Sequence, residues 1–258
     1  MATLKRAICA NNIANANSDT RHNASAKRVG TPSDDTTNGF VLPIPSQTSR
    51  KISWRSRGSC RGTAVLRLNG SQQIVVYESL LELMCILLIT TRVDVLAVWD
   101  QPPAIRYRRP DGIPHEHTFD YLIELETGLR YAVAIKPKAM IAKRQFDIEL
   151  GYVAAAMPEN FADDVILLSE GDFTRAQALN AQRYHEFAKS PDIEADEKIM
   201  NVASQAREPR TLADLIELSG LAGRGFRAAF RAIIEGRLNQ LNPEKIGLQT
   251  LVSAEGLV

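Results

Sequence analysis

The sequence predicts a mixed α/β fold followed by a small unit of helices and a hairpin. Three observations predict it: an apolar, helix-length stretch at 78–92, several short strand-like stretches between 95 and 136, and a helix, a strand and a helix between 141 and 188. This order is typical of a mixed sheet flanked by helices, rather than of a helical bundle or a β-sandwich.

Turn-forming residues separate these elements. Asn69-Gly70 lies between two strand-like stretches, 63–68 and 73–77, as in a tight hairpin. The stretch at 78–92 is apolar on nearly every side, so we expect it to be a buried helix. The remaining expected elements are strands at 95–99, 104–109, 118–126, 129–136 and 165–169, and helices at 141–156 and 174–188.

Composition divides the chain into three regions. Residues 1–48 are rich in Asn, Ser, Thr and Ala and predict a disordered basic tail, 49–189 hold the α/β pattern, and 197–258 form a second unit after a linker at 190–196. Residues 1–62 contain ten Lys or Arg against three acids. Such a basic end favours a polyanion such as nucleic acid, although a solvated tail has the same composition. The side chains expected to contact DNA here are Arg50, Lys51, Arg55 and Arg57.

Bulk composition narrows the class of protein. The 258 residues are 24% charged and carry a net charge of +1, which suits a packed globular core. The 3 cysteines lack zinc-ligand spacing and fit no disulfide framework. The longest apolar run, 83–89, is too short to cross a bilayer. We therefore expect a cytoplasmic protein, associated with the nucleoid where it binds DNA.

Three charged residues stand out from their apolar surroundings. Glu82 lies between two leucines, and an ionised carboxylate buried there needs a cation, a metal or a water-filled cleft. An exposed polar stripe with Glu78 is the alternative. Asp120 interrupts an apolar strand, where Asp is disfavoured, and Lys136 ends the next strand. A hairpin can therefore place Asp120 and Lys136 side by side.

Four motifs occur in an order that resembles a known family. They are Tyr77-Glu78-Ser79-Leu80-Leu81-Glu82-Leu83, then Gln101-Pro102-Pro103 with Ile105-Arg106-Tyr107, then His117-Thr118-Phe119-Asp120-Tyr121-Leu122, and Ala134-Ile135-Lys136-Pro137. The set is similar to the N-terminal domain of TnsA-type transposon-end endonucleases, in the PD-(D/E)xK superfamily, over roughly 49–140. The resemblance implies a restriction-endonuclease-like sheet with Glu82, Asp120 and Lys136 as active-site residues.

The resemblance also implies a chemistry. The carboxylates of Glu82 and Asp120 would bind Mg²⁺ (or Mn²⁺), which polarises the phosphodiester and helps to generate hydroxide from water. The ammonium group of Lys136 would neutralise charge on the phosphate or position the water. The implied function is a metal-dependent DNA endonuclease that cuts strands at mobile-element ends during transposition, with a DDE transposase and an AAA+ ATPase regulator as partners.

Two positions depart from the family pattern. Phe119 replaces the proline before Asp120, and proline is not a ligand. Ala134 replaces the acid or amide two residues before the lysine, and a methyl group cannot bind Mg²⁺. Glu149, on the following helix, can supply the missing carboxylate as a metal ligand and catalytic residue, with Asp147 as a weaker substitute. Otherwise the site is weakened or inactive, and the chain is a DNA-binding or assembly factor that keeps the nuclease fold.

His115 and His117 precede Asp120 and raise the question of a metal pair. A third ligand at zinc spacing is missing from the nearby sequence. We therefore expect both to be polar residues that alternate outward on a strand.

The C-terminal unit has the outline of a winged helix, with two helices and a hairpin at 238–251. The second helix, 223–235, carries Arg224, Arg227 and Arg231 on one face, which suits contact with DNA. Solvated arginines are the alternative. In TnsA-type proteins this domain docks the ATPase regulator, so the face can instead meet a protein. A transcriptional regulator inferred from this unit alone would leave 78–137 unexplained.

Overall fold

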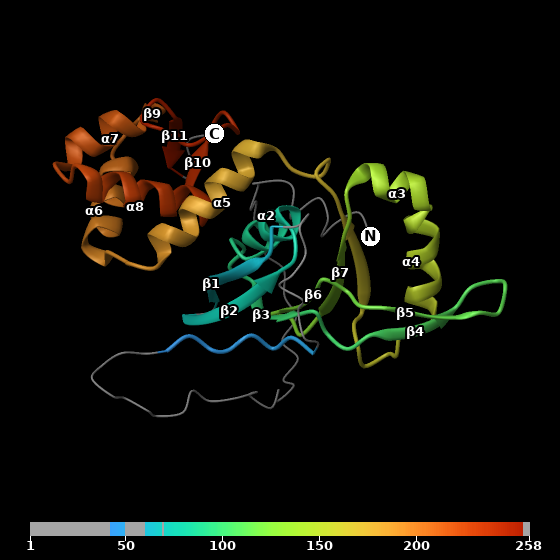
Figure 1. The fold of residues 1–258 in the computed structure, drawn as a ribbon. Helices are drawn as coiled ribbons and strands as arrows, with labels where there is room; N and C mark the ends of the chain where they lie inside the picture. Colours follow the sequence, from blue (N-terminus) through green and yellow to red (C-terminus); the bar gives the residue numbers. More distant parts are fainter. Residues whose placement is uncertain (1–41, 50–59, 69, 255–258) are drawn as a thin grey trace.

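The computed structural model describes residues 42–49, 60–68 and 70–254, which form a mixed α/β structure (Figure 1). The expected tail at 1–41 and the basic residues Arg50, Lys51, Arg55 and Arg57 lie outside the described residues. The N-terminal elements are β1 (Gly62–Leu68), β2 (Ser71–Tyr77), α2 (Leu80–Ile89), β3 (Val95–Asp100), β4 (Ile105–Arg108), β5 (Pro114–His117), β6 (Tyr121–Leu125), β7 (Arg130–Ile135), α3 (Lys138–Arg144), α4 (Phe146–Ala155), β8 (Asp164–Leu168) and α5 (Arg175–Ala188).

Four strands in the order β3-β6-β7-β8 form the central sheet. β6 pairs antiparallel with both β3 and β7, whereas β8 runs parallel to β7. A parallel pair needs a crossover connection, which α3 and α4 provide. The expected mixed sheet flanked by helices is therefore confirmed at this level.

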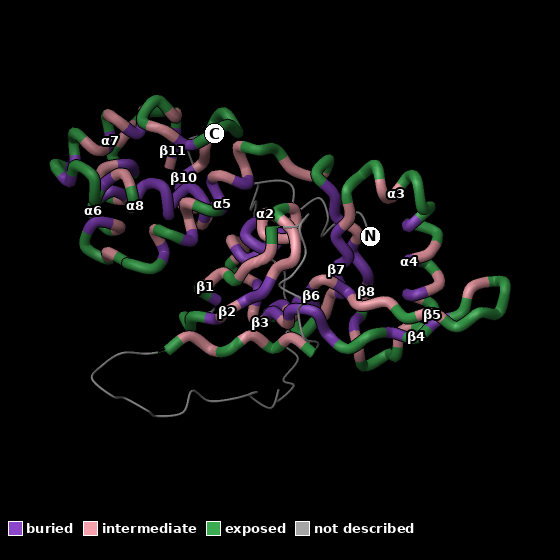
Figure 2. Tube along the Cα trace, viewed as in Figure 1, coloured by how far each residue is buried: buried purple, intermediate pink, exposed green. Residues whose placement is uncertain are grey.

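Both faces of this sheet are covered. Tyr121 and Val133 face a core that includes α2 and Ala181 of α5. Leu122 and Ala134 face a second core, built with α4 and with the β4–β5 hairpin. Figure 2 shows the resulting buried stretch along the sheet. Burial on both faces explains why β6 and β7 are almost continuously apolar in sequence.

The expected helix at 78–92 forms α2, but only its C-terminal half is buried. Its N-cap is Ser79, and residues 85–89 are buried, whereas Leu80 is 50% exposed. The first turn therefore emerges from the core, and Glu82 lies at the boundary between core and solvent.

Part of the expected disordered tail is bound to the sheet. In the segment 42–49, Ile44 forms a parallel bridge with Gln73. The buried Asp100 accepts hydrogen bonds from the Ser46 hydroxyl (2.5 Å) and from the Val76 N–H (2.8 Å). A buried carboxylate requires such donors, so Asp100 fixes this segment next to β2 and β3.

The expected helix at 141–156 is two helices. Gln145 has φ +48° and ψ +44°, in the left-handed region, so α3 ends there and α4 begins directly after it. Only Gly, Asn and Asp commonly adopt this conformation, so the sequence gives no sign of the break. The structure also contains a strand that was not expected, β5, which pairs antiparallel with β4. The strand expected at 118–126 is shorter and forms β6.

The C-terminal unit consists of α6 (Ile193–Ser204), β9 (Arg210–Thr211), α7 (Leu212–Ser219), α8 (Gly223–Ile234), β10 (Leu238–Gln240) and β11 (Leu251–Ala254). Its three strands pair in the order β10-β11-β9. The hairpin is confirmed, but its second strand begins at Leu251 instead of 246. Among the described residues, no helix has the length and apolarity needed to span a membrane.

The expected linker at 190–196 is shorter than predicted, because residues 193–196 belong to α6. Asp192 is the N-cap of this helix, and Ala195 and Ile199 are buried in the C-terminal core. Helix α5 joins the two cores, since Ala181 belongs to the first and Phe187 packs against the second.

Candidate active site

Asp120 and Lys136 meet at one edge of the central sheet, as predicted. The Asp120 N–H donates to the Val133 carbonyl (2.9 Å) just before β6 begins. Lys136 directly follows β7, and its Nζ lies 3.5 Å from Asp120 Oδ2. The Ile135 N–H also donates to Oδ2, at 2.6 Å. The antiparallel register of β6 and β7 thus brings together two side chains that are sixteen positions apart in the sequence.

Asp120 is a buried acid with a raised pKa. Burial raises the pKa of its carboxyl group from 3.8 to about 6, Lys136 opposes this rise, and the charge of Glu82 adds to it. Asp120 thus lies beside one ammonium group and within electrostatic reach of a second acid, Glu82. Such a cluster gains free energy when a further cation enters it.

Glu82 has a structural role in addition to its position near Asp120. Its backbone N–H donates to the Ser79 hydroxyl oxygen at 3.1 Å, which caps α2. Its carboxylate accepts from the Ser79 hydroxyl (2.9 Å) and from the Glu78 N–H (2.7 Å). These bonds occupy one lone pair on each oxygen, so the carboxylate retains the capacity to bind a further donor or a cation.

The third acid, Glu149, is bound by side chains on or next to β4. Glu149 accepts hydrogen bonds from the Tyr107 hydroxyl and from Arg109 (2.6 Å), both on or next to β4. Asp147 is exposed at the start of α4. Ala134 is fully buried within the core that faces α4, so apolar side chains surround the position where the family carries its acid. That Glu149 replaces this acid stays a prediction: its carboxylate is engaged by Tyr107 and Arg109, and its charge also acts on the ring of His117.

The residues present fit a Mg²⁺ ion bound by two carboxylates. Glu82 and Asp120 would hold it, since Mg²⁺ commonly takes one or two carboxylates and completes its shell with water and substrate phosphate. Among residues 42–49, 60–68 and 70–254, no group of three or more His, Cys, Asp or Glu is placed to hold a metal. A cage built from protein ligands alone is therefore not formed by the described side chains.

His117 was missed as a site residue. The expectation that it faces outward is wrong, because its ring packs edge-on against Phe119 (4.9 Å between centroids) and lies 5.6 Å from Phe146. Burial, followed by the charge of Lys136, lowers its pKa to about 4, so the ring is neutral at pH 7. Its Nε2 is buried without a hydrogen-bond partner. The pairing of Ile105 with His117 explains the orientation, since both face α4.

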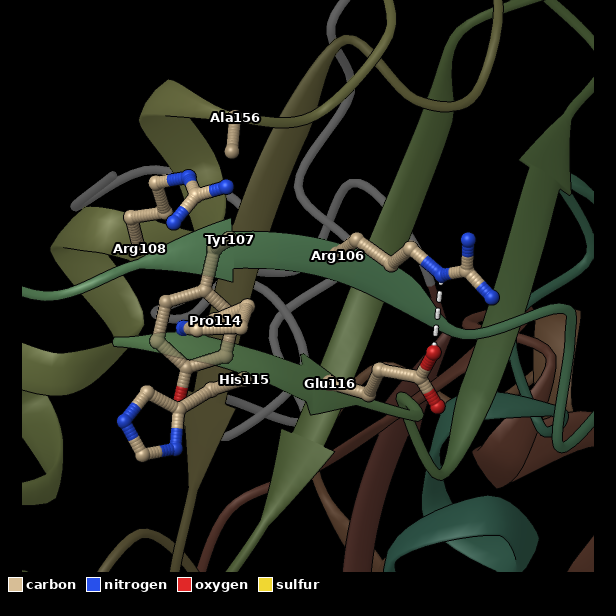
Figure 3. A pocket seen from close by; sticks show the side chains of 7 residues that line it. All are labelled: Arg106, Tyr107, Arg108, Pro114, His115, Glu116 and Ala156. Atoms are coloured by element: carbon tan, nitrogen blue, oxygen red, sulfur yellow. Dashed lines mark hydrogen bonds and ion pairs between the residues drawn. The ribbon is translucent and has the colours of Figure 1, made fainter. Parts of the chain in front are cut away.

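The β4–β5 hairpin places different chemistry on its two faces. Tyr107 and His115 stack on the face toward α4, with 5.6 Å between ring centroids. On the outer face, Arg106 forms an ion pair with Glu116 at 2.8 Å (Figure 3). Arg108 donates to the Gly112 carbonyl at 2.6 Å. A shallow pocket of about 670 Å³ lies between this hairpin and Ala156.

The arginines of α8 do not form an exposed stripe. Arg231 is buried, and its guanidinium donates to Asp196 (2.6 Å) and to the Phe187 carbonyl (3.3 Å). Arg224 is bound by Asp192 and by Glu194 at 2.7–2.8 Å. Arg227 alone of the three is exposed with no ion pair to another described residue. The expectation of DNA contact through this stripe is thus contradicted for Arg231, whose charge is satisfied internally.

Neither a protein-family model nor a curated protein matches this chain. The functional assignment therefore depends on the geometry of the edge that holds Glu82, Asp120 and Lys136.

Proposed function

We propose that the chain is a metal-dependent DNA endonuclease that resembles TnsA-type enzymes and cuts strands at mobile-element ends. One observation carries this proposal: Lys136 Nζ lies 3.5 Å from Asp120, whose pKa is raised in part by the neighbouring Glu82. A restriction-endonuclease-like sheet with a winged-helix-like unit is part of the same proposal. Supporting it are the mixed four-strand sheet and the three-strand sheet packed with α6, α7 and α8.

Each residue of the candidate active site has a role in this reaction. A bound Mg²⁺ would polarise the phosphodiester and lower the pKa of an attacking water. Asp120 and Glu82 hold negative charge at the sheet edge, and the Lys136 ammonium neutralises charge that develops on the phosphate. The neutral ring of His117 lies close enough to Lys136 for its pKa to respond to that charge.

The test is cleavage by the full chain. Supercoiled plasmid is incubated with wild type, Lys136→Met and Asp120→Asn in Mg²⁺ and in Mn²⁺, with Lys198→Gln on the exposed face of α6 as control. We expect nicking by wild type and by the control, and at least a 100-fold lower rate in the two site variants, as removal of one electrostatic group costs on the order of 10²–10³ in rate. Equal rates in wild type and Lys136→Met would refute the proposal.

A second candidate is a DNA-binding or assembly factor without catalysis. The buried Ala134 and the engagement of Glu149 by Tyr107 and Arg109 favour it. It predicts salt-sensitive binding of DNA with no metal requirement. Metal-dependent nicking that disappears in Asp120→Asn would eliminate it.

The partners remain those that the resemblance implies, a DDE transposase and an AAA+ regulator. The C-terminal unit is the better candidate for protein contact than for DNA contact. Its arginines at 224 and 231 are bound by acids of α6 and its cap, and α5 packs Phe187 against Phe226 and Phe230 of α8. Such a nuclease would act in the cytoplasm, on nucleoid DNA.

A further inference from the structure

Helix α3 differs from the other helices in how little it packs. It has no buried residue, whereas every other helix of the described residues has at least two (Figure 2). A seven-residue helix is too short to be stable by itself in water, since isolated helices need about 12–15 residues. An unpacked surface of this kind is available for contact with another molecule.

The charge of α3 is entirely positive. Lys138, Lys143 and Arg144 are exposed, and the helix contains no acid. The nearest acids in the chain flank its ends: the Glu170 carboxylate accepts from the Lys138 N–H, and Asp147 follows in the first turn of α4. Lys143 and Arg144 have no ion pair with another described residue. Two exposed cations thus lie in the last turn without an ion pair to any described residue.

The position of α3 relates it to the candidate active site. It begins directly after Lys136-Pro137 and ends before Phe146, whose ring centroid lies 5.7 Å from Lys136 Nζ. The chain therefore leaves the site at Lys136, forms α3, and returns to the site. By contrast, Arg106 and Arg109 are paired with Glu116 and Glu149.

We infer that Lys143 and Arg144 of α3 bind the phosphate backbone of duplex DNA beside the phosphate at Lys136. The inference deepens the proposed function, on which it rests, by naming the element that holds the substrate. Two adjacent cations without acids complement a polyanion, and phosphate contacts position a duplex without reading its sequence. The left-handed Gln145 ends α3 directly after these two residues, and both are exposed.

The test of this inference is binding of a labelled 30-base-pair duplex by the full chain. Affinity is measured by fluorescence anisotropy in EDTA between ~50 and ~300 mM salt, because phosphate contacts dominate affinity over this range. The variant is Lys143→Gln/Arg144→Gln. Its matched control, Lys198→Gln/Arg207→Gln, removes the same two charges from exposed positions of the C-terminal unit. Far-UV circular dichroism and Tm verify that each variant is folded.

We expect the slope of log Kd against log salt to fall by about 1.8 in the α3 variant, because each phosphate contact contributes about 0.9. At about 0.1 M salt this corresponds to roughly 60-fold weaker binding, whereas the control should change less than about threefold. An α3 variant with the slope and affinity of wild type would overturn the inference. Plasmid nicking separates the two proposals: Lys136→Met should fail to cut, whereas its loss of duplex binding should be only that of one phosphate contact, a slope change of about 0.9. If wild type binds through α3 but cuts nothing, the nuclease proposal fails and the phosphate contact stands.

Discussion

Asp120→Asn should make the protein more stable and, at the same time, insensitive to metal. The pKa of Asp120 is raised from 3.8 to about 6, chiefly by burial. One pKa unit corresponds to about 1.4 kcal/mol, so the ionised carboxylate costs the folded state up to about 3 kcal/mol well above pH 6. Asn removes this cost and keeps an oxygen that can accept from the Ile135 N–H.

The sign of the pH dependence follows from the raised pKa. Between about pH 4 and 6 the folded protein holds a proton on Asp120 that the unfolded chain has lost, so the free energy of unfolding of wild type falls as pH rises through this window. Below pH 4 both states are protonated, and Asp120→Asn should equal wild type. Above pH 6 it should be more stable, by up to about 3 kcal/mol, a figure that already includes the Lys136 pair because that pair lowers the pKa of Asp120.

Urea unfolding at pH 4 and pH 8, with and without ~10 mM Mg²⁺, measures both effects, because a ligand that binds only the folded state raises its stability. Glu186→Gln, an exposed acid on α5, is the control for removal of one negative charge. Wild type should gain stability from Mg²⁺ at pH 8 and not at pH 4, and Asp120→Asn at neither. If Asp120→Asn is less stable than wild type at pH 8, or still responds to Mg²⁺, the view of Asp120 as a desolvated metal ligand is wrong.

Five further substitutions test the roles of single side chains. Glu82→Gln should abolish the Mg²⁺ response, whereas Ser79→Ala should cost only about 1 kcal/mol through the lost cap and keep that response, as measured by urea unfolding. Arg231→Ala should destabilise the protein by about 3–5 kcal/mol because it leaves Asp196 without its buried partner. The exposed Arg227→Ala should change stability by less than about 0.5 kcal/mol. Similar values for both variants would contradict the burial of Arg231. Glu149→Ala should leave the Mg²⁺ response unchanged, and its loss would show that this carboxylate reaches the metal.

The parts of the fold that the sequence predicts are those determined by local pattern. The β1–β2 hairpin follows from Asn69-Gly70, and the meeting of Asp120 with Lys136 follows from two strands at hairpin distance. Helix α6 was also within reach, since Asp192 is a good N-cap and Ala195, Ile199 and Ala203 recur at steps of four. The polar composition of residues 190–196 favoured a linker over this helical pattern in the sequence alone.

The parts that could not be predicted depend on contacts between distant segments. Asp100 is bound by Ser46, 54 positions earlier, and a single sequence gives no sign of that pair. The inward orientation of His117 depends on β5, a four-residue strand with no apolar alternation. Arg231 shares helical spacing with exposed arginines, but α5 and α6 cover its side of α8. In each case tertiary packing overrides a local pattern.

Ala134 has a consequence for how folding and metal binding are coupled. A carboxylate at this fully buried position would be desolvated among the apolar side chains that face α4. An unpaired buried charge costs several kcal/mol, so a protein with an acid at this position would need its metal in order to be stable. With Ala at this position, the interface between the sheet and α4 is complete without any ion. We therefore expect ~5 mM EDTA to change the Tm by less than about 2 °C relative to the protein without EDTA and without added metal. The only stabilisation that EDTA can remove is that of ligand bound to the folded state. Scanning calorimetry of the metal-depleted chain measures this, and unfolding by EDTA at 25 °C would mean that a metal is part of the core.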